Sequence, residues 1–372
     1  MNLKLKNTPE QIELIKAMGS KDRAVAREAQ EAFAAFLGPV VRQVLNQAGT
    51  TGAVYTDVPF DEDDSPSYPL DLYYDEGDNY VQTWSQSVAG GLPTSAVEGM
   101  SELKISTYRI DSAVSFLAKY ARRARLDVVS KGIERMAQEV LVKQERNGWA
   151  VILKALAEGT TSSLRHVEVG TTANEFQLHD LNKLVTRGRR INESFANGTP
   201  DPAYSKGVTD LYVSPEIMQN VRAFAYQPMN TRSAVGTADK DSTSIPLPDN
   251  IRSDIYNAAG TQEIYGINLV EMNEFGVSKK YNTLFDTFAT HTDINGPGGS
   301  DFATGTDEIL VGIDNSKGAF IRPLAQNADS GSTFSASPDD QFNARAEKIG
   351  FYGALEEGRV CIDARAVVGI TI

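Results

Sequence analysis

Apolar side chains recur every three or four residues through the middle of the chain, which is the spacing of one helix face. The clearest series is Leu126, Val129, Ile133, Met136 and Val140. No proline occurs between residues 112 and 159, so the pattern predicts one long helix over this range. Asp111 or Ser112 would cap its start, and Gly159 would end it. Gly148 is expected to mark a break, since glycine costs about 1 kcal/mol relative to alanine inside a helix.

Other periodic segments predict a mixed α+β chain. Thr8 and Pro9 are typical of a helix start, and the alanine-rich stretch 21–36 predicts a second helix that Gly38 and Pro39 would interrupt before it resumes over 40–48. A further helix is predicted over 178–191 and another after Pro215. Alternating or continuous apolar patterns predict strands over 103–110, 207–213, 264–272, 308–314 and 319–323, the last two as neighbours. Strands over 343–349, 359–363 and 366–372 would form a closing sheet.

Residues 50–102 have a different composition from the rest of the chain. No lysine or arginine occurs between Arg42 and Lys104, whereas carboxylates, prolines and aromatic residues are frequent. A structureless loop of this length is unusual in a compact domain, and the segment is too aromatic for a solvated tail. It therefore predicts a projecting hairpin that buries aromatic side chains on another chain. The carboxylate run that begins at Asp61 could bind calcium or magnesium, but its spacing fits no EF-hand loop, so a solvated acidic turn is the expectation.

Composition and charge narrow the classes of function. The chain has 372 residues, a net charge of −13 and one cysteine, Cys361. An acidic chain is a poor candidate for wrapping nucleic acid through its phosphates. A lone cysteine suits a reducing compartment, and neither a signal peptide nor a membrane span is apparent, so a soluble cytoplasmic product is expected.

Motifs for catalysis are missing from the sequence. The three histidines His166, His179 and His291 have no partners at metal-ligand spacing, and Cys361 lies in an apolar strand pattern that predicts an inert core thiol. There is no nucleophile elbow, dinucleotide fingerprint or zincin pair. We therefore expect no catalytic, cofactor or metal site. A hydrolase that uses paired carboxylates stays open as an alternative, because residues paired only in space leave no mark in one sequence.

Three local patterns, in this order, resemble a known family. Residues 108–111 lead into the long helix, which continues through 149–153. Residues 209–215 form a strand and turn before a helix, and residues 343–347 precede a closing pattern at 359–366. Together with the acidic excursion, this order resembles the major capsid protein of tailed bacteriophages, the HK97-like fold. The resemblance extends over nearly the whole chain as an order of elements.

The resemblance implies an α+β HK97-like capsid fold with an N-terminal arm (1–50), an extended β-hairpin loop or E-loop (51–110) and a long spine helix. The peripheral domain would comprise 111–225 and 336–372, and the axial domain 226–335. The implied function is structural, with no enzymatic activity: copies self-assemble as hexamers and pentamers into an icosahedral head shell around the phage genome. Implied partners are portal, scaffolding and decoration proteins, with packaged DNA contacted only weakly and no membrane. The virion would be assembled in the host cytoplasm.

One departure from the family and one candidate interface follow. Some members join subunits through a loop lysine, but here the loop lacks lysine outside its base at Lys104. The shell is therefore expected to form without such crosslinks. The acidic loop of one subunit is expected to contact the basic end of a neighbour's predicted 178–191 helix. The expected interface residues are Asp61, Glu62, Asp63, Asp64, Tyr73, Tyr74, Trp84, Arg187, Arg189 and Arg190.

Three alternatives remain open at the level of sequence. An encapsulin-type nanocompartment shell shares the fold and would enclose an enzyme cargo. A phage tail or adaptor subunit would form tubes or rings. The hydrolase would instead form a small oligomer with a substrate pocket.

Overall fold

The computed structural model describes most of the chain in separate ranges. These are residues 8–47, 49–61, 65–69, 102–123, 126–161, 164–171, 175–192, 207–223, 262–289, 302–326, 333–339 and 347–372. The chain divides into two compact units. The first unit comprises Met1–Tyr68, Glu102–Trp149 and Phe320–Val360, and the second comprises Pro69–Ser101, Ala150–Ala319 and Cys361–Ile372.

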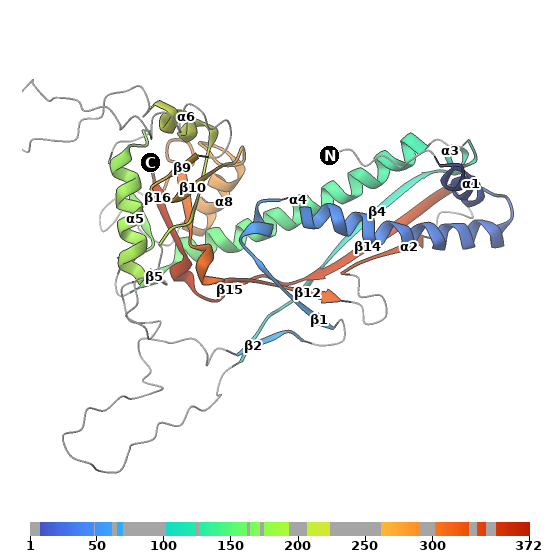
Figure 1. Cartoon of the computed structure of the whole chain (residues 1–372), viewed down its shortest axis with the longest axis horizontal. Helices are drawn as coiled ribbons and strands as arrows, with labels where there is room; N and C mark the ends of the chain where they lie inside the picture. Colours follow the sequence, from blue (N-terminus) through green and yellow to red (C-terminus); the bar gives the residue numbers. More distant parts are fainter. Residues whose placement is uncertain are drawn as a thin grey trace, which may run out of the picture. The chain divides into compact units, whose positions relative to one another are not determined.

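A six-stranded sheet forms the framework of the first unit (Figure 1). Its strands are β1 (Thr56–Asp61), β4 (Tyr108–Leu117), β12 (Phe320–Gln326), β13 (Phe334–Asp339), β14 (Lys348–Glu357) and β15 (Val360–Cys361). β4 is antiparallel to β14 along its whole length, from Tyr108 opposite Glu357 to Leu117 opposite Lys348. β1 is parallel to β12 and is an edge strand among the described residues. A separate two-stranded pair joins β2 (Ser67–Pro69) to β3 (Glu102–Lys104).

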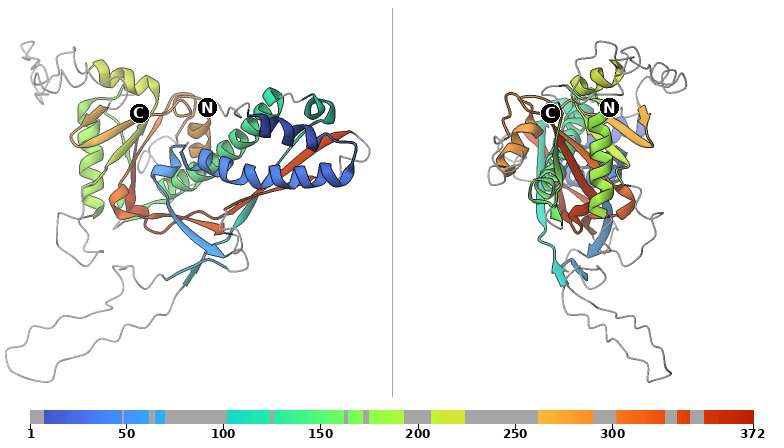
Figure 2. Two further views of the ribbon diagram at one scale, coloured as in Figure 1. Left: turned by 45° about the vertical axis from the view of Figure 1, so that its right-hand side comes forward. Right: turned by 90° about the vertical axis from the view of Figure 1, so that its left-hand side faces the viewer.

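Helices cover one face of this sheet. They are α1 (Pro9–Met18), α2 (Arg23–Gln47), α3 (Ala118–Arg122) and the first part of α4 (Leu126–Glu158). Figures 1 and 2 show α2 and α4 running along the β4 and β14 strands. The core joins Phe33 of α2 to Phe351 of β14, whose ring centroids are 5.3 Å apart, and Val129 and Ile133 of α4 pack in the same cluster. Arg109, Asp111, Ala113 and Ser115 alternate outward along β4, as a half-buried strand requires.

The predicted start of the long helix is wrong. Residues 112–117 belong to β4, so neither Asp111 nor Ser112 is a helix cap. Strand pairing with β14 satisfies the backbone here, and Val114 faces the helices while Asp111 is exposed. The other end is confirmed, since α4 stops at Glu158, directly before Gly159.

The predicted helix breaks are also wrong. α4 continues through Gly148, and α2 continues through Gly38 and Pro39. At Gly148 the helix needs a residue without a side chain, because an added Cβ would lie 2.4 Å from Nη1 of Arg359 and 2.7 Å from Cγ2 of Thr51. The Thr8 cap is confirmed: its hydroxyl oxygen accepts a hydrogen bond from the backbone N–H of Gln11 (3.4 Å).

A second six-stranded sheet forms the second unit, in the order β7-β16-β11-β8-β10-β9. Its strands are β7 (Val167–Val169), β8 (Asp210–Val213), β9 (Gln262–Ile264), β10 (Ile267–Glu271), β11 (Ile309–Ile313) and β16 (Val367–Thr371). The helices of this unit are α5 (Leu178–Asn192), α6 (Pro215–Ala223), α8 (Lys280–Ala289) and the end of α4. A short pair joins β5 (Thr160–Thr161) to β6 (Leu164–Arg165). α5 packs on β16, as the second view in Figure 2 shows.

Three predicted strand arrangements need correction. The strand predicted over 264–272 is a hairpin, because Tyr265 and Gly266 form a turn between β9 and β10. The strands on either side of residues 315–318 are not neighbours, since β11 and β12 belong to different sheets. The closing strands likewise separate, with β14 in the first unit and β16 in the second. No helix in the described ranges is long and apolar enough to cross a membrane.

Candidate functional site

The segment that follows α2 is hydrogen-bonded to the middle of α4 through Thr50 and Thr51. Glu145 accepts hydrogen bonds from the hydroxyls of Thr50 (2.8 Å) and Thr51 (2.6 Å) and from both of their backbone N–H groups (3.2 Å). The indole N–H of Trp149 donates to the Thr50 hydroxyl at 3.0 Å. Gly49 precedes them at φ +117°, where an added Cβ would lie 2.2 Å from the Glu145 carboxylate. One carboxylate thus satisfies a turn that comes directly before β1.

A buried ion pair lies next to this anchor in the first unit. Glu357 and Arg359 have side chains that are 0% and 1% exposed, and the Arg359 Nε is 3.2 Å from the Glu357 Oε1. Gln144 of α4 donates to the other carboxylate oxygen (2.9 Å), and the Tyr108 hydroxyl donates to Oε1 (2.7 Å). Burial, followed by the Glu357 charge, raises the pKa of Tyr108 above its usual value. The phenol is therefore a stable donor, and the carboxylate is fully bonded as a buried charge requires.

Tyr55 completes the cluster from the other end of the segment. Its ring lies under the Arg359 guanidinium (4.8 Å to the centroid), and its hydroxyl donates to the Gly148 carbonyl at 2.9 Å. Tyr55 leads into β1, whereas Tyr108 opens β4. Both ends of the segment between these strands are therefore held by one buried polar cluster, which we call the base cluster (Tyr55, Tyr108, Gln144, Glu357 and Arg359).

Strand β1, which follows Tyr55 of the base cluster, is largely exposed. All residues of β1 except Phe60 are exposed, and Val58 is 38% exposed. Arg322 of β12 donates to both oxygens of Asp57 (2.6 and 2.7 Å), which fixes the strand laterally. Farther out, β2 and β3 pair, and the Ile105 N–H donates to the Pro66 carbonyl (3.0 Å). The outgoing and returning chains therefore meet again at residues 66–69 and 102–105.

Most of the predicted interface residues of this segment cannot be placed. Asp61 is the last residue of β1 and is exposed. The remaining members lie outside the described residues: Glu62, Asp63, Asp64, Tyr73, Tyr74 and Trp84. Their contact with another chain stays a prediction.

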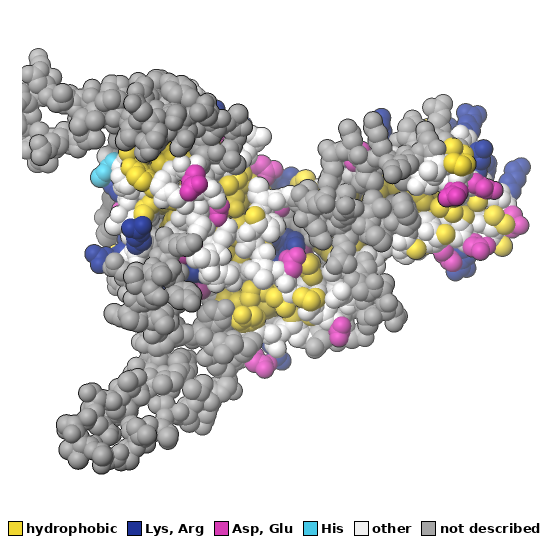
Figure 3. All heavy atoms as spheres, in the orientation of Figure 1, with side chains coloured by type: hydrophobic (Ala, Val, Ile, Leu, Met, Phe, Trp, Pro, Cys, Tyr) yellow, Lys and Arg dark blue, Asp and Glu magenta, His cyan; other side chains and the backbone are white. Residues whose placement is uncertain are grey.

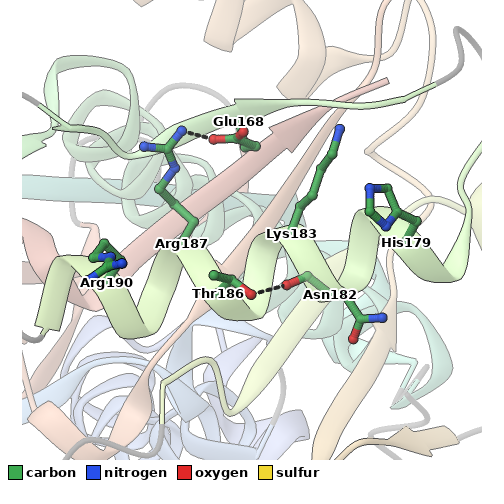
Figure 4. Close-up of a pocket in the computed structure, with 7 residues that line it drawn as sticks. All are labelled: Glu168, His179, Asn182, Lys183, Thr186, Arg187 and Arg190. Carbon is green, nitrogen blue, oxygen red and sulfur yellow. Dashed lines mark hydrogen bonds and ion pairs between the residues drawn. The ribbon is translucent and has the colours of Figure 1, made fainter. Parts of the chain in front are cut away.

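The predicted basic helix end forms one side of a shallow pocket in the second unit. The pocket has a volume of about 310 Å³ and is lined by Glu168, His179, Asn182, Lys183, Thr186, Arg187 and Arg190 (Figure 4). Arg187 forms an ion pair with Glu168 of β7, and burial lowers the pKa of its guanidinium. The Lys183 ammonium is 3.4 Å from the Val169 carbonyl oxygen. We call this the α5 pocket; in Figure 3, lysine and arginine side chains gather over α5.

The three predicted arginines of α5 are not equivalent. Arg187 is committed to Glu168, and Arg190 lies at the pocket with Arg187. Arg189 is exposed and does not line the pocket. The surface can therefore offer positive charge in two directions, into the pocket and away from it. Such an arrangement suits binding of carboxylates or of aromatic rings.

Buried titratable groups of the second unit lie apart from this pocket. Burial lowers the pKa of His166 to about 4 and raises that of Cys361 to about 12, so both side chains are neutral at pH 7. Burial also raises the pKa of Glu308 to about 7. His291 lies outside the described residues, and His179 is exposed. Within the described ranges no group of three or more His, Cys, Asp or Glu side chains could hold a metal ion.

The base cluster and Glu145 were not identified from the sequence. Glu357-Gly358-Arg359 has the composition of an exposed turn, and Glu145 has that of an exposed helix position. The one available signal was Gly148, an unfavourable residue inside an otherwise regular helix pattern. Close approach of Arg359 and Thr51 explains it.

Comparison with solved structures identifies the fold. The capsid of the native GTA particle matches with a TM-score of 0.51 and 10% sequence identity, covering 87% of this chain and 91% of that chain. A structure of Microbacterium phage Oxtober96 matches with a TM-score of 0.49 and 14% identity over 87% and 90% of the two chains. The holo-SrpI encapsulin complex from Synechococcus elongatus PCC 7942 gives a TM-score of 0.45 and 10% identity over 89% and 94%. No protein-family model and no protein of curated function matches the sequence.

These findings define the class of fold. The mixed helix-and-sheet architecture and the match to the GTA capsid give the chain an HK97-like capsid fold. The predicted resemblance to HK97-like capsid proteins is confirmed at this level. Because the identity is only 10%, the likeness establishes the fold alone.

Proposed function

We propose that this chain is the major capsid subunit of a tailed bacteriophage and self-assembles into the icosahedral head shell that encloses the genome. The observation that carries the proposal, beside the fold, is that both ends of the segment between β1 and β4 are anchored in one buried cluster. Tyr55 and Tyr108 meet at the buried Glu357–Arg359 pair, whereas β1 beyond it is exposed. A firmly held base with an exposed extension suits a segment whose partner is another chain.

The exposed edge of β1 supports a role in subunit contacts. A strand edge with unpaired N–H and C=O groups is a template for another chain, and soluble proteins usually cover it. β1 pairs with β12 on one side only among the described residues. In a shell, a neighbouring subunit would cover the other side and the apolar side chain of Val58.

The remaining parts of the proposal follow from composition and fold. Residues 1–50 would be the N-terminal arm, 51–110 the extended loop, 111–225 with 336–372 the peripheral domain, and 226–335 the axial domain. The role is structural rather than enzymatic, and the shell forms without lysine crosslinks because the loop lacks lysine beyond its base. A net charge of −13 suits a wall that does not grip DNA. Portal, scaffolding and decoration proteins would be partners, with assembly in the host cytoplasm.

The acidic loop would contact the end of α5 in a neighbouring subunit. Arg189 and Arg190 are both exposed at this end of the helix. Arg187 forms an ion pair with Glu168 of the same subunit. Replacing Arg189 and Arg190 by glutamate should hinder assembly, because like charges would then face the loop carboxylates. Replacement of both by lysine keeps the charge and should permit assembly. Normal shells from the glutamate variant would rule out this contact.

Imaging of purified protein tests the function itself. Size-exclusion chromatography followed by negative-stain microscopy should show closed shells, or rings of five and six subunits. A monomer or dimer that does not assemble under crowding and added salt would refute the proposal. Packaged DNA inside the particles would support a phage head, whereas a copurified enzyme would indicate a nanocompartment.

A further inference from the structure

Tyr265 occupies an unusual position at the end of the β9–β10 hairpin. It has φ +56°, followed by Gly266 at φ +77°, so both turn residues are in the left-handed region. Such two-residue turns favour asparagine, aspartate or glycine, and a bulky residue there is strained. At 58% exposed, Tyr265 is also the most exposed large hydrophobic side chain in the described ranges.

Neither packing nor turn geometry within the subunit explains a tyrosine here. An added Cβ on Gly266 would have no heavy atom within 4 Å, apart from its chain neighbours, so the turn is not crowded at this position. Strain at an exposed aromatic residue is better explained by a role outside the subunit, because strained residues concentrate at binding surfaces. Tyrosine is also enriched among the residues that dominate the energetics of interfaces.

The α5 pocket offers a matching receptor. Lys183 and Arg190 line this pocket of about 310 Å³ together with the Arg187–Glu168 pair. Cations placed over the face of a tyrosine ring attract it by about 0.5–2 kcal/mol. Glu263, two residues before Tyr265, is exposed on β9 and would complement the positive rim of the pocket.

Sheet topology places the two features at opposite edges of one sheet. β9 is the last strand at one edge, and β7, which carries Glu168, is the last strand at the other. Both belong to the second unit. A projecting residue at one edge and a pocket at the other cannot pair within one subunit. They are suited to head-to-tail contacts, which close into rings when the rotation between copies allows it.

We propose that Tyr265 of one subunit inserts into the α5 pocket of the adjacent copy, between Lys183 and Arg190, as a head-to-tail contact within each ring of subunits. This inference rests on the proposed shell function and assigns a residue-level contact to it. Only a second copy of this chain is required as the partner.

Photocrosslinking tests the contact directly. A benzophenone amino acid placed at position 265 should, in assembled particles, crosslink to the peptide that contains Lys183 and Arg190 of another subunit. The same probe at Val277, an exposed apolar residue of the same unit, should not reach that peptide. Particles that form normally but crosslink from position 265 to other surfaces would overturn the contact and leave the shell function intact. Failure of the unmodified chain to assemble at all would overturn both.

Substitutions give a second, independent readout. Tyr265→Asn removes the ring and relaxes the left-handed turn, so it should raise the unfolding temperature of the unassembled subunit while weakening each contact about tenfold. Tyr265→Phe keeps the ring and should assemble like the wild type. Lys183→Glu should weaken assembly without changing subunit stability. Unchanged assembly of both Tyr265→Asn and Lys183→Glu would contradict the proposal.

Discussion

The Glu145 carboxylate on α4 receives two hydrogen bonds from Thr51, one from its hydroxyl at 2.6 Å and one from its backbone N–H at 3.2 Å. The neighbouring Thr50 binds the same carboxylate with equivalent groups. Four donors therefore converge on one helix side chain and fix the direction in which the chain enters β1. Loss of this carboxylate would free the turn without touching the hydrophobic core.

Replacement of Glu145 by alanine should lower the free energy of unfolding by about 2–3 kcal/mol, since hydrogen bonds to a charged group are lost together and their donors are left partly buried. Denaturant unfolding of the unassembled subunit measures this. Glu139→Ala is the matched control, because Glu139 is exposed on the same helix. Equal effects of the two substitutions would show that the Glu145 contacts contribute little.

The buried pair of Glu357 and Arg359 should show strong coupling. Removing one partner, as in Arg359→Met, leaves a buried charge and should cost about 3–5 kcal/mol. The double variant Glu357→Leu/Arg359→Met should lose less free energy of unfolding than the two single variants lose together. A double-mutant cycle by chemical denaturation measures the coupling, and simple additivity would contradict the geometry seen here.

Two glycines of α4 provide a matched comparison. Gly148→Ala should destabilise the protein by about 1–3 kcal/mol, because the new methyl group meets Arg359 and Thr51 in a tightly packed site. Gly132→Ala should be neutral or stabilising by up to about 1 kcal/mol, because alanine favours the helix. Its single close neighbour is the Val114 side chain at 3.3 Å. Thermal unfolding measures the change in unfolding temperature of each variant. Equal changes for the two variants would contradict the close packing at Gly148.

Glu308 should make stability fall as pH rises. Burial, with the nearby charge of Glu216 adding to it, raises the pKa of Glu308 to about 7 from a usual value of 4.5. Its contribution is therefore fully present below pH 4.5 and is lost as pH rises through 7. Glu308→Gln should remove this dependence and be more stable than the wild type at pH 8. Unfolding temperatures between pH 5 and 8 measure it, and identical slopes for both proteins would refute it.

His166 should act in the opposite direction. Burial lowers its pKa to about 4 from 6.5, so its contribution is present above pH 6.5 and is lost as pH falls through 4. The pH ranges over which His166 and Glu308 change stability overlap, and their opposite contributions to the free energy of unfolding partly cancel in the wild type. His166→Gln should expose the Glu308 slope alone as a steeper fall with rising pH. An unchanged slope would show that the pKa of His166 is not lowered by folding.

Local sequence signals predicted those elements whose structure is decided locally. The Thr8 cap, the stop after Glu158 and helix α5 follow from capping residues and helical spacing. Residues 112–117 were assigned to the wrong element because serine, alanine and valine there fit either structure. These residues form a strand because they pair with β14, which lies more than two hundred residues away in the sequence. Tertiary pairing of this kind overrides weak local preference.

The candidate sites were less predictable than the fold for the same reason. The basic end of α5 could be found as a cluster of like charges. The ion pair of Arg187 with Glu168 could not be predicted from the sequence, because it depends on the packing of β7 beside α5. Tyr265 lies in a sequence pattern typical of a single strand, so its exposure could not be predicted. The exposure results from a turn with φ +56° at Tyr265, a conformation that tyrosine disfavours.

The sheet of the first unit joins opposite ends of the chain, with Thr56 beside Ile321 and Tyr108 beside Glu357. During synthesis, β1 and β4 leave the ribosome long before β12 and β14 exist. Their edges and the helices above them must wait without partners, and closing contacts between such distant segments is slow. A nascent chain that ends before β12 therefore lacks both the base cluster and most strands of this sheet. Folding of the first unit therefore finishes only after β14, near the end of this sequence, has been synthesised.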